Sequence, residues 1–248
     1  MTLYIGTSGW AYKEWKPGFY PADLPQSRFL EHYGSVLSAC EINATFYRRQ
    51  EESTFDRWAS STPAPFRFAT KAHRGLTHGR GTIYNPERVQ FLQEFLQSVG
   101  RLGPKLGAVL FQFPPTRPRD DQQLEGLLNA LEGRMPFALE FRHDSWDATD
   151  VRERVAFGGG TVCIGHTEGP VPESLPPGRL AYVRLRDQHY EDERRDRWLE
   201  LFTREAENRD VFAFTKHEGI PAGDPYGGIG LAQWLVQRVT APADQVDA

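Results

Sequence analysis

The sequence has little of several features that would each point to a particular class of protein. No apolar run approaches the ~20 residues of a membrane-spanning helix, and the first residues enter a strand-like run without a charged leader. Only 2 cysteines occur, and their positions match no metal-ligand spacing. Two such thiols are typical of a reducing compartment. We therefore expect a soluble, cytoplasmic protein without membrane contact, in which Cys40 and Cys163 are small buried core residues.

A net positive charge and a dinucleotide-binding fingerprint are also missing. The formal net charge is -4, which excludes a global positive field for sequence-independent nucleic-acid binding, although a local basic patch is compatible with it. The GTSG run at residues 6–9 lacks the G-x-G-x-x-G spacing that follows the first strand of a dinucleotide-binding fold. We therefore expect no redox cofactor.

The sequence does contain eight strand-like runs that alternate with segments of helical periodicity. The clearest helix is expected at residues 85–100, with Asn85 as the N-cap and Gly100 just beyond the last turn. Eight such units in about 240 residues favour an α/β fold, a single closed (β/α)8 TIM barrel. We expect residues 1–240 to form this domain and residues 241–248 a disordered tail. The strands are predicted at residues 3–7, 39–43, 66–71, 108–112, 137–140, 161–164, 181–185 and 211–215.

Charged and polar residues gather at the ends of these runs, as in FALEFRHDSW at residues 137–146. In a TIM barrel the C-terminal strand ends carry the active site, and inward-facing residues alternate with residues that face the helices. This alternation predicts one inward-facing polar cluster. The alternative is a buried network of ion pairs that only fixes the barrel, because interior charges must be paired. The predicted members are Glu41, Asn43, Lys71, His73, Gln112, Glu140, Arg142, Tyr182, Arg184, Arg186, Thr215 and His217.

Several dispersed motifs, in the same order, resemble those of the YecE-like family, a prokaryotic domain of unknown function numbered seventy-two. The motifs are GTSGW at 6–10, EINATFY at 41–47, TPAPFRFATK at 62–71, QFPP at 112–115, EFRHDSW at 140–146 and YVRLR at 182–186. The resemblance implies a TIM barrel and no established activity. The chain departs from the family's pattern in the sixth- and eighth-strand regions, which read CIGHTEG and FAFTKHEG. The resemblance marks as motif positions Trp10, Glu41, Asn43, Lys71, Gln112, Glu140, Arg142 and Arg184.

Three residues are the catalytic candidates. Glu41 and Glu140 form a pair of carboxylates, which can act as acid and base, including in glycoside cleavage. Lys71 could form a Schiff base if its amine were desolvated, but nearby carboxylates are expected to raise its pKa, which favours an electrostatic role. The substrate-binding candidates are Trp10, Asn43, His73, Gln112, Arg142, Tyr182, Arg184 and Arg186.

Histidines and aromatic residues each allow two interpretations. Six histidines lie near predicted strand ends, but no spacing matches a metal motif, so we expect hydrogen-bonding side chains and no metal site. The rings between Trp10 and Tyr20 could form a stacking wall for a sugar or base, or a small satellite core under a long loop. The histidines in question are His73, His78, His143, His166, His189 and His217.

Together these patterns predict an enzyme that acts on a small anionic or sugar-like metabolite. A hydrolase, lyase or isomerase is favoured over a redox enzyme, because no nucleotide fingerprint is present. Lys71, Arg142, Arg184 and Arg186 outnumber the two glutamates, so we expect an anion-binding pocket. Two alternatives stay open: a nucleic-acid phosphodiesterase resembling barrel endonucleases, and a non-catalytic ligand-binding barrel. The sequence gives no indication of oligomeric state.

Overall fold

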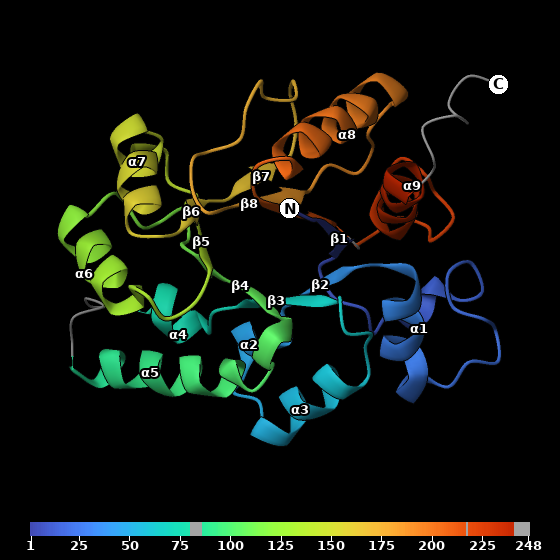
Figure 1. Cartoon of the computed structure of the whole chain (residues 1–248), viewed down its shortest axis with the longest axis horizontal. Coiled ribbons are helices and arrows are strands. Elements are labelled where there is room, and N and C mark those ends of the chain that lie inside the picture. The colour runs from blue at the N-terminus through green and yellow to red at the C-terminus, as the bar shows by residue number, and fades with distance from the viewer. Residues whose placement is uncertain (80–85, 217, 241–248) are drawn as a thin grey trace.

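A computed structural model describes residues 1–79, 86–216 and 218–240. Parallel strands form one sheet in the order β6-β5-β4-β3-β2-β1-β9-β8-β7, and the helices surround it (Figure 1). No helix among the described residues is long and apolar enough to cross a bilayer. The strands are β1 (Leu3–Thr7), β2 (Ala39–Ile42), β3 (Arg67–Lys71), β4 (Leu106–Gln112), β5 (Phe137–Glu140), β6 (Thr161–Val162), β7 (Ile164–His166), β8 (Leu180–Leu185) and β9 (Asp210–Thr215).

The sheet curls into a nearly closed barrel, which confirms the predicted TIM-barrel class. The two end strands of the sheet, β6 and β7, follow each other in the chain and are separated by Cys163 alone. They correspond to the sixth predicted strand, which therefore pairs with β5 in its first half and with β8 in its second half. The chain thus joins the two edges of the sheet directly, through Cys163.

Helices cover the outside of the barrel and direct their apolar stripes toward the strands. In α5 (Pro86–Gly100) the stripe consists of Leu92, Phe95, Leu96 and Val99, all buried. Gly100 is the last helical residue, so its predicted place beyond the helix is off by one position. Asn85 and the predicted tail at 241–248 lie outside the described residues. The other helices are α1 (Phe29–Val36), α2 (Ala44–Tyr47), α3 (Glu52–Ser60), α4 (Arg74–Thr77), α6 (Asp121–Leu131), α7 (Thr149–Phe157), α8 (Asp192–Ala206) and α9 (Gly228–Thr240).

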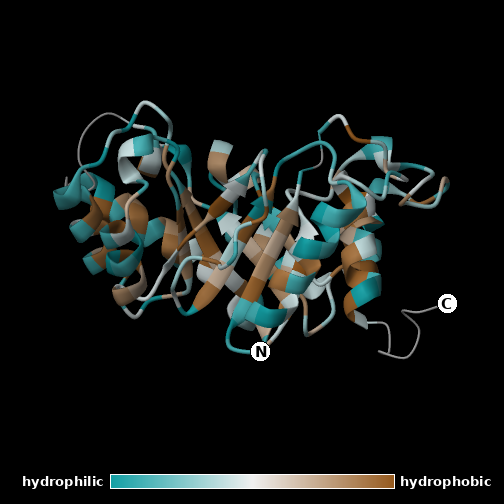
Figure 2. Cartoon of the chain, turned by 90° about the horizontal axis from the view of Figure 1, so that it is seen from above, coloured by the Kyte–Doolittle hydropathy of each residue, from teal (hydrophilic) through white to brown (hydrophobic). Residues whose placement is uncertain are grey.

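Two apolar layers result from the alternation of side chains along the strands. One layer lies between strands and helices and includes Cys40, Phe68 and Leu139, and hydrophobic residues are concentrated on the strands and the inner helix faces (Figure 2). The other layer fills the barrel, where Tyr4 of β1 stacks on Phe212 of β9 at 4.8 Å between ring centroids. Both cysteines are buried, as predicted. The interior layer contains Tyr4, Ala39, Ala69, Ala108, Leu110, Ala138, Cys163, Leu180, Tyr182, Phe212 and Phe214.

The predicted alternation is wrong on β9. Phe212 and Phe214 face the interior, so Thr215 faces α9 instead, where its Oγ1 donates to the carbonyl oxygen of Gly228 at 2.7 Å. Because the run VFAF is apolar at every position, its sequence pattern does not indicate which residues point inward. His217, the other predicted inward residue, lies outside the described residues.

Candidate functional site

The C-terminal strand ends hold a buried arginine that joins two buried glutamates. Arg184 of β8 donates its Nη1 to Glu140 Oε2 at 2.7 Å and its Nη2 to Glu41 Oε1 at 2.9 Å. The three residues are only 2%, 4% and 0% exposed, respectively. The planar fork of arginine suits two such charge-assisted bonds, and buried charges require them. Arg184 therefore connects β2, β5 and β8 across the barrel interior.

Both carboxylates also accept hydrogen bonds from other side chains. Glu41 accepts hydrogen bonds from Ser8 Oγ at 3.0 Å and from the Tyr182 hydroxyl at 2.8 Å. Glu140 accepts one from Arg142 Nε at 2.8 Å. Burial alone would raise the pKa of Glu140, but the charges and hydrogen bonds of Arg184 and Arg142 outweigh burial and lower it. Glu140 is therefore ionised and poorly suited to donate a proton.

Lys71, the last residue of β3, carries a buried amine at the same end of the barrel. The residue is 8% exposed, and its Nζ lies 4.2 Å from the ring centroid of Phe46. Within the described part of the chain, this Nζ makes no hydrogen bond or ion pair with a carboxylate. Burial, with the charge of Arg184, lowers the pKa of Lys71 to about 8, although Glu41 and Glu140 oppose the shift. The two carboxylates do act to raise this pKa, as expected, but burial outweighs their attraction, so the net shift is downward.

Two polar side chains of the predicted set border this cluster. Gln112 ends β4 opposite Glu140 in the strand register and is 3% exposed. Its Oε1 is buried and finds no hydrogen-bond partner among the described residues, and the same holds for Arg184 Nε. Asn43 donates its Nδ2 to the carbonyl oxygen of Ser8 at 3.4 Å. Gln112 and Arg184 thus each keep one buried polar atom without a partner among the described residues.

Arg186 adds a further cation just beyond the end of β8. Burial, followed by repulsion from Arg184, lowers the pKa of Arg186, and within the described ranges its guanidinium has no carboxylate partner. Arg142 uses only its Nε in the ion pair with Glu140. Four cationic side chains thus accompany two glutamates, so the mouth is locally positive although the whole chain has a net charge of -4.

The structure separates two of the substrate-binding candidates, His73 and Trp10, from the cluster. His73 lies two residues beyond β3, where strand alternation no longer applies. Its Nδ1 accepts the backbone N–H of Gly75 at 3.0 Å, and its ring packs against Phe91 of α5. Trp10 packs edge-to-face on Trp58 of α3, with 5.5 Å between ring centroids. The prediction that His73 points into the mouth is therefore wrong, and Trp10 contacts the helical layer.

The aromatic loop after β1 forms a satellite core. Trp15 and Tyr20 are fully buried, and Tyr20 stacks on Phe29 of α1 at 3.9 Å between ring centroids. Trp15 also stacks on Tyr33 of the same helix at 6.5 Å. These rings pack against each other, so the loop forms a small satellite core rather than a stacking wall for a ligand.

His73, His78, His143 and His166 form side-chain hydrogen bonds within the fold, the ring of His189 packs against Tyr226, and His217 lies outside the described residues. His166 Nδ1 lies 3.2 Å from the Tyr190 hydroxyl, and His143 Nδ1 lies 2.9 Å from Ser145 Oγ. Across residues 1–79, 86–216 and 218–240, no three His, Cys, Asp or Glu side chains are arranged to hold a metal ion.

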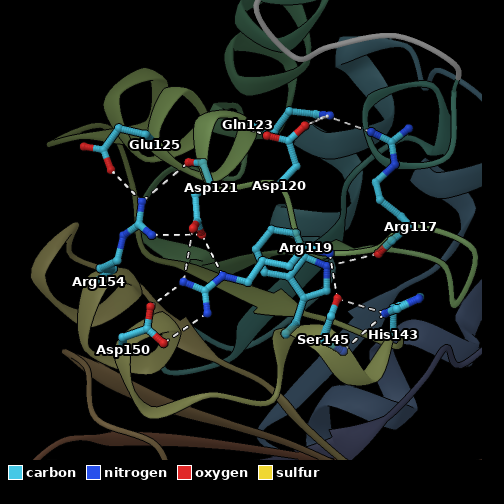
Figure 3. Close-up of polar contacts among 11 residues, drawn as sticks. Arg117, Arg119, Asp120, Asp121, Gln123, Glu125, His143, Ser145, Asp150 and Arg154 are labelled. Atoms are coloured by element: carbon cyan, nitrogen blue, oxygen red, sulfur yellow. Dashed lines mark hydrogen bonds and ion pairs between the residues drawn. The ribbon is translucent and has the colours of Figure 1, made fainter.

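A polar network, not foreseen from the sequence, braces the rim of the mouth between β4 and β5 (Figure 3). Arg119, in the loop after β4, pairs with Asp121 of α6 and with Asp150 of α7. Its backbone N–H donates to Ser145 Oγ at 2.7 Å. The indole N–H of Trp146 donates to the carbonyl oxygen of Arg117 at 3.0 Å. The loops that follow β4 and β5 are thus held together on one side of the mouth.

A cavity of about 600 Å³, which we call the lateral cavity, lies beside the mouth. It is bounded by the residues after β5, by the split sixth strand and by the proline-rich loop that precedes β8. Arg142 and Gly165 lie on its side nearest the glutamates. The cavity therefore adjoins the cationic side chains of the mouth.

The family pattern described as "Protein of unknown function DUF72" matches residues 4–242. Among curated proteins, "UPF0759 protein YunF" of Bacillus subtilis (strain 168) is 33% identical over 149 residues, which are 58% of this chain and 52% of that protein. The matched region thus spans about half the length of this relative.

Solved structures show the same fold. A DUF72 family protein from Thermotoga maritima has a TM-score of 0.75 at 21% identity, covering 97% of this chain and 100% of that chain. One from Enterococcus faecalis has a TM-score of 0.73 at 18% identity, covering 96% and 95%. A D-psicose 3-epimerase, solved in the presence of D-fructose, has a TM-score of 0.53 at 10% identity, covering 95% and 90%. At these identities the likeness concerns the fold.

Proposed function

The chain belongs to the DUF72 family of proteins of unknown function, and we propose that it is an enzyme acting on a small anionic or sugar-like metabolite at the barrel mouth. One observation carries this proposal. The amine of Lys71 is buried, lacks a carboxylate partner within the described residues, and has its pKa lowered to about 8. Perturbed amines of this kind are characteristic of acid–base and nucleophilic catalysis.

The lowered pKa values of Lys71 and Glu140 favour proton transfer as the reaction type. An amine with a pKa near 8 can take a proton from a carbon next to a carbonyl group and return it, which is the chemistry of isomerases and lyases. Hydrolysis by a pair of carboxylates fits less well, because the pKa of Glu140 is lowered and an acid must hold its proton. In this proposal Glu41 and Glu140 are positioning residues that act through Arg184.

The remaining cations favour an anionic substrate. Arg186 and the free nitrogens of Arg142 offer paired donors to a phosphate or carboxylate. Sugar chemistry on the same fold has a precedent in the D-psicose 3-epimerase, whose likeness bears on architecture alone. A cytoplasmic setting belongs to the proposal, because Cys40 and Cys163 are both free.

Deuterium incorporation tests this proposal directly. We expect the wild-type protein, in D₂O with glucose 6-phosphate or ribose 5-phosphate, to exchange a carbon-bound proton that NMR detects. Lys71→Met should lower the exchange rate at least about a hundredfold, the usual contribution of a general base. Lys71→Arg, which keeps the charge but not the titration near neutrality, serves as the matched control and should be equally slow.

Other results would contradict the proposal. Exchange that persists in Lys71→Met would remove Lys71 from the reaction. Binding of these compounds without exchange in the wild type would favour the non-catalytic ligand-binding barrel. Cleavage of single-stranded or duplex DNA in the same preparations would favour the phosphodiesterase instead.

A further inference from the structure

The split sixth strand leaves a gap in the barrel wall beside the mouth. Val162 pairs with Leu139 of β5, and the N–H of Cys163 donates to the carbonyl oxygen of Leu139 at 2.9 Å. From Ile164 onward the strand pairs with β8 instead, so that Gly165 lies opposite Arg184. The end of β5 and the start of β7 therefore separate at the level of Glu140. The lateral cavity of about 600 Å³ lies at this separation.

The lateral cavity adjoins the cationic mouth at Arg142 and Gly165. Arg142, whose Nε holds Glu140, also lines the cavity. Gly165 lines it too, and a Cβ at this position would lie 3.8 Å from Glu140 Oε1 and 4.0 Å from Arg186 Cδ. A ligand anchored at Arg142 and Arg186 can thus extend past the bare backbone of Gly165 into the cavity.

The lining combines apolar surfaces with charged groups of both signs. Pro172, Pro176 and Pro177 supply carbon surface, against which the C–H face of a sugar ring can pack. Arg152 and Asp147, which pair with each other, supply donors and acceptors for hydroxyl groups. The volume lies within the range of about 300–1,000 Å³ that is usual for small-molecule sites.

We propose that the lateral cavity binds the part of the sugar that does not react, while Arg142 and Arg186 bind the anionic group and the reacting carbon stays in the mouth beside Lys71. This inference rests on the proposed function and narrows it to monosaccharide phosphates and sugar acids. It also makes Gly165 a specificity-determining residue, because a side chain larger than a methyl group would project between the two parts of the site.

Isothermal titration calorimetry with inorganic phosphate, glucose 6-phosphate and gluconate tests this assignment. We expect the wild type to bind glucose 6-phosphate at least tenfold more tightly than inorganic phosphate. Gly165→Val, a β-branched residue suited to a strand, should lower the affinity for glucose 6-phosphate at least tenfold and leave that for phosphate within twofold. Gly165→Ala is the matched control and should stay near wild type, because its Cβ meets only ordinary contacts.

Ser174→Trp approaches the cavity from its exposed outer loop and gives a second, independent block. It should weaken the binding of glucose 6-phosphate but not of phosphate, and Ser174→Ala should change neither. Gluconate distinguishes the substrate classes, since a sugar acid should show the same pattern with its carboxylate. Equal affinities of wild type for phosphate and glucose 6-phosphate, or equal losses for both in Ser174→Trp, would overturn the cavity assignment alone. Failure of all three compounds to bind would overturn the proposed anion site itself.

Discussion

The pairing of Arg184 with both glutamates determines what Lys71 can do. Glu41 and Glu140 direct carboxylate oxygens to the guanidinium of Arg184, and the amine of Lys71 lies over the ring of Phe46. Burial then dominates and lowers the pKa of Lys71. One strand-end cluster therefore combines an ionised Glu140 with a partly neutral amine, a difference that residue types alone do not specify.

The lowered pKa of Lys71 predicts a pH dependence of stability. It falls from 10.5 to about 8 on folding, so between these values the unfolded chain holds a proton that the folded chain has released. The free energy of unfolding should therefore rise with pH across this window. Urea denaturation of wild type and Lys71→Met should show the wild type gaining stability relative to the variant from pH 8 to 10.5. A constant difference would show that the amine keeps its proton.

Glu140→Gln tests the ion pairs at the mouth. The change keeps the shape of the side chain but leaves the buried Arg184 with one carboxylate, Glu41. Removing one partner of a buried pair typically costs about 3–5 kcal/mol, and we expect a loss near the lower end because Glu41 stays. Urea denaturation measures this loss, with Glu125→Gln, an exposed ion pair with Arg154, as the control. A loss as small as that of Glu125→Gln would argue against a structural contribution of Glu140.

At the scale of elements, the approach of β1 to β2 depends on a glycine. Gly6 lies opposite Ala39 in the parallel pair, and a Cβ on Gly6 would lie 1.8 Å from the carbonyl oxygen of Ala39. The same oxygen accepts the hydroxyl of Tyr33 from α1 at 2.9 Å. β2 cannot move away without breaking this contact between strand and helix.

Gly6→Ala should consequently destabilise the barrel by about 3 kcal/mol or more, at the upper end of overpacking costs. Thermal denaturation followed by circular dichroism measures the change. Gly100→Ala, at the end of α5 with no atom within 4 Å of the added Cβ, should unfold at the wild-type temperature. Comparable melting temperatures for the two variants would contradict the close approach of β1 and β2.

At the scale of the whole molecule, the charge at the mouth is opposite in sign to the net charge of the chain. The chain carries -4 overall, but the mouth gathers Lys71, Arg142, Arg184 and Arg186 around two glutamates. We expect inorganic phosphate at 100 times its dissociation constant to add about 2.7 kcal/mol to the free energy of unfolding. Thermal shift measurements check this, with potassium chloride at equal ionic strength as the control. The same stabilisation by chloride would indicate screening rather than a site.

The sequence allowed the barrel and most of the mouth to be predicted, because strand alternation and the C-terminal location of TIM-barrel sites are general. Glu41, Glu140, Arg184 and Tyr182 meet as expected. Thr215 was wrongly predicted to face the interior because its strand is apolar on both faces. His73 was wrongly predicted to do so because it lies beyond the end of its strand. The split of the sixth strand and the network around Arg119 depend on backbone register and loop geometry, which composition does not encode.

The change of partner at Cys163 also makes this strand the natural seam of the barrel. Val162 pairs only with β5 and Gly165 only with β8, whereas Gly6 of β1 pairs on both sides. Separating the wall here breaks the fewest lateral backbone hydrogen bonds, so local opening should begin here. We expect the amides of residues 164–166 to show the fastest hydrogen–deuterium exchange of any strand, and glucose 6-phosphate in the lateral cavity to slow it. The barrel wall would then open locally at this strand when a ligand enters.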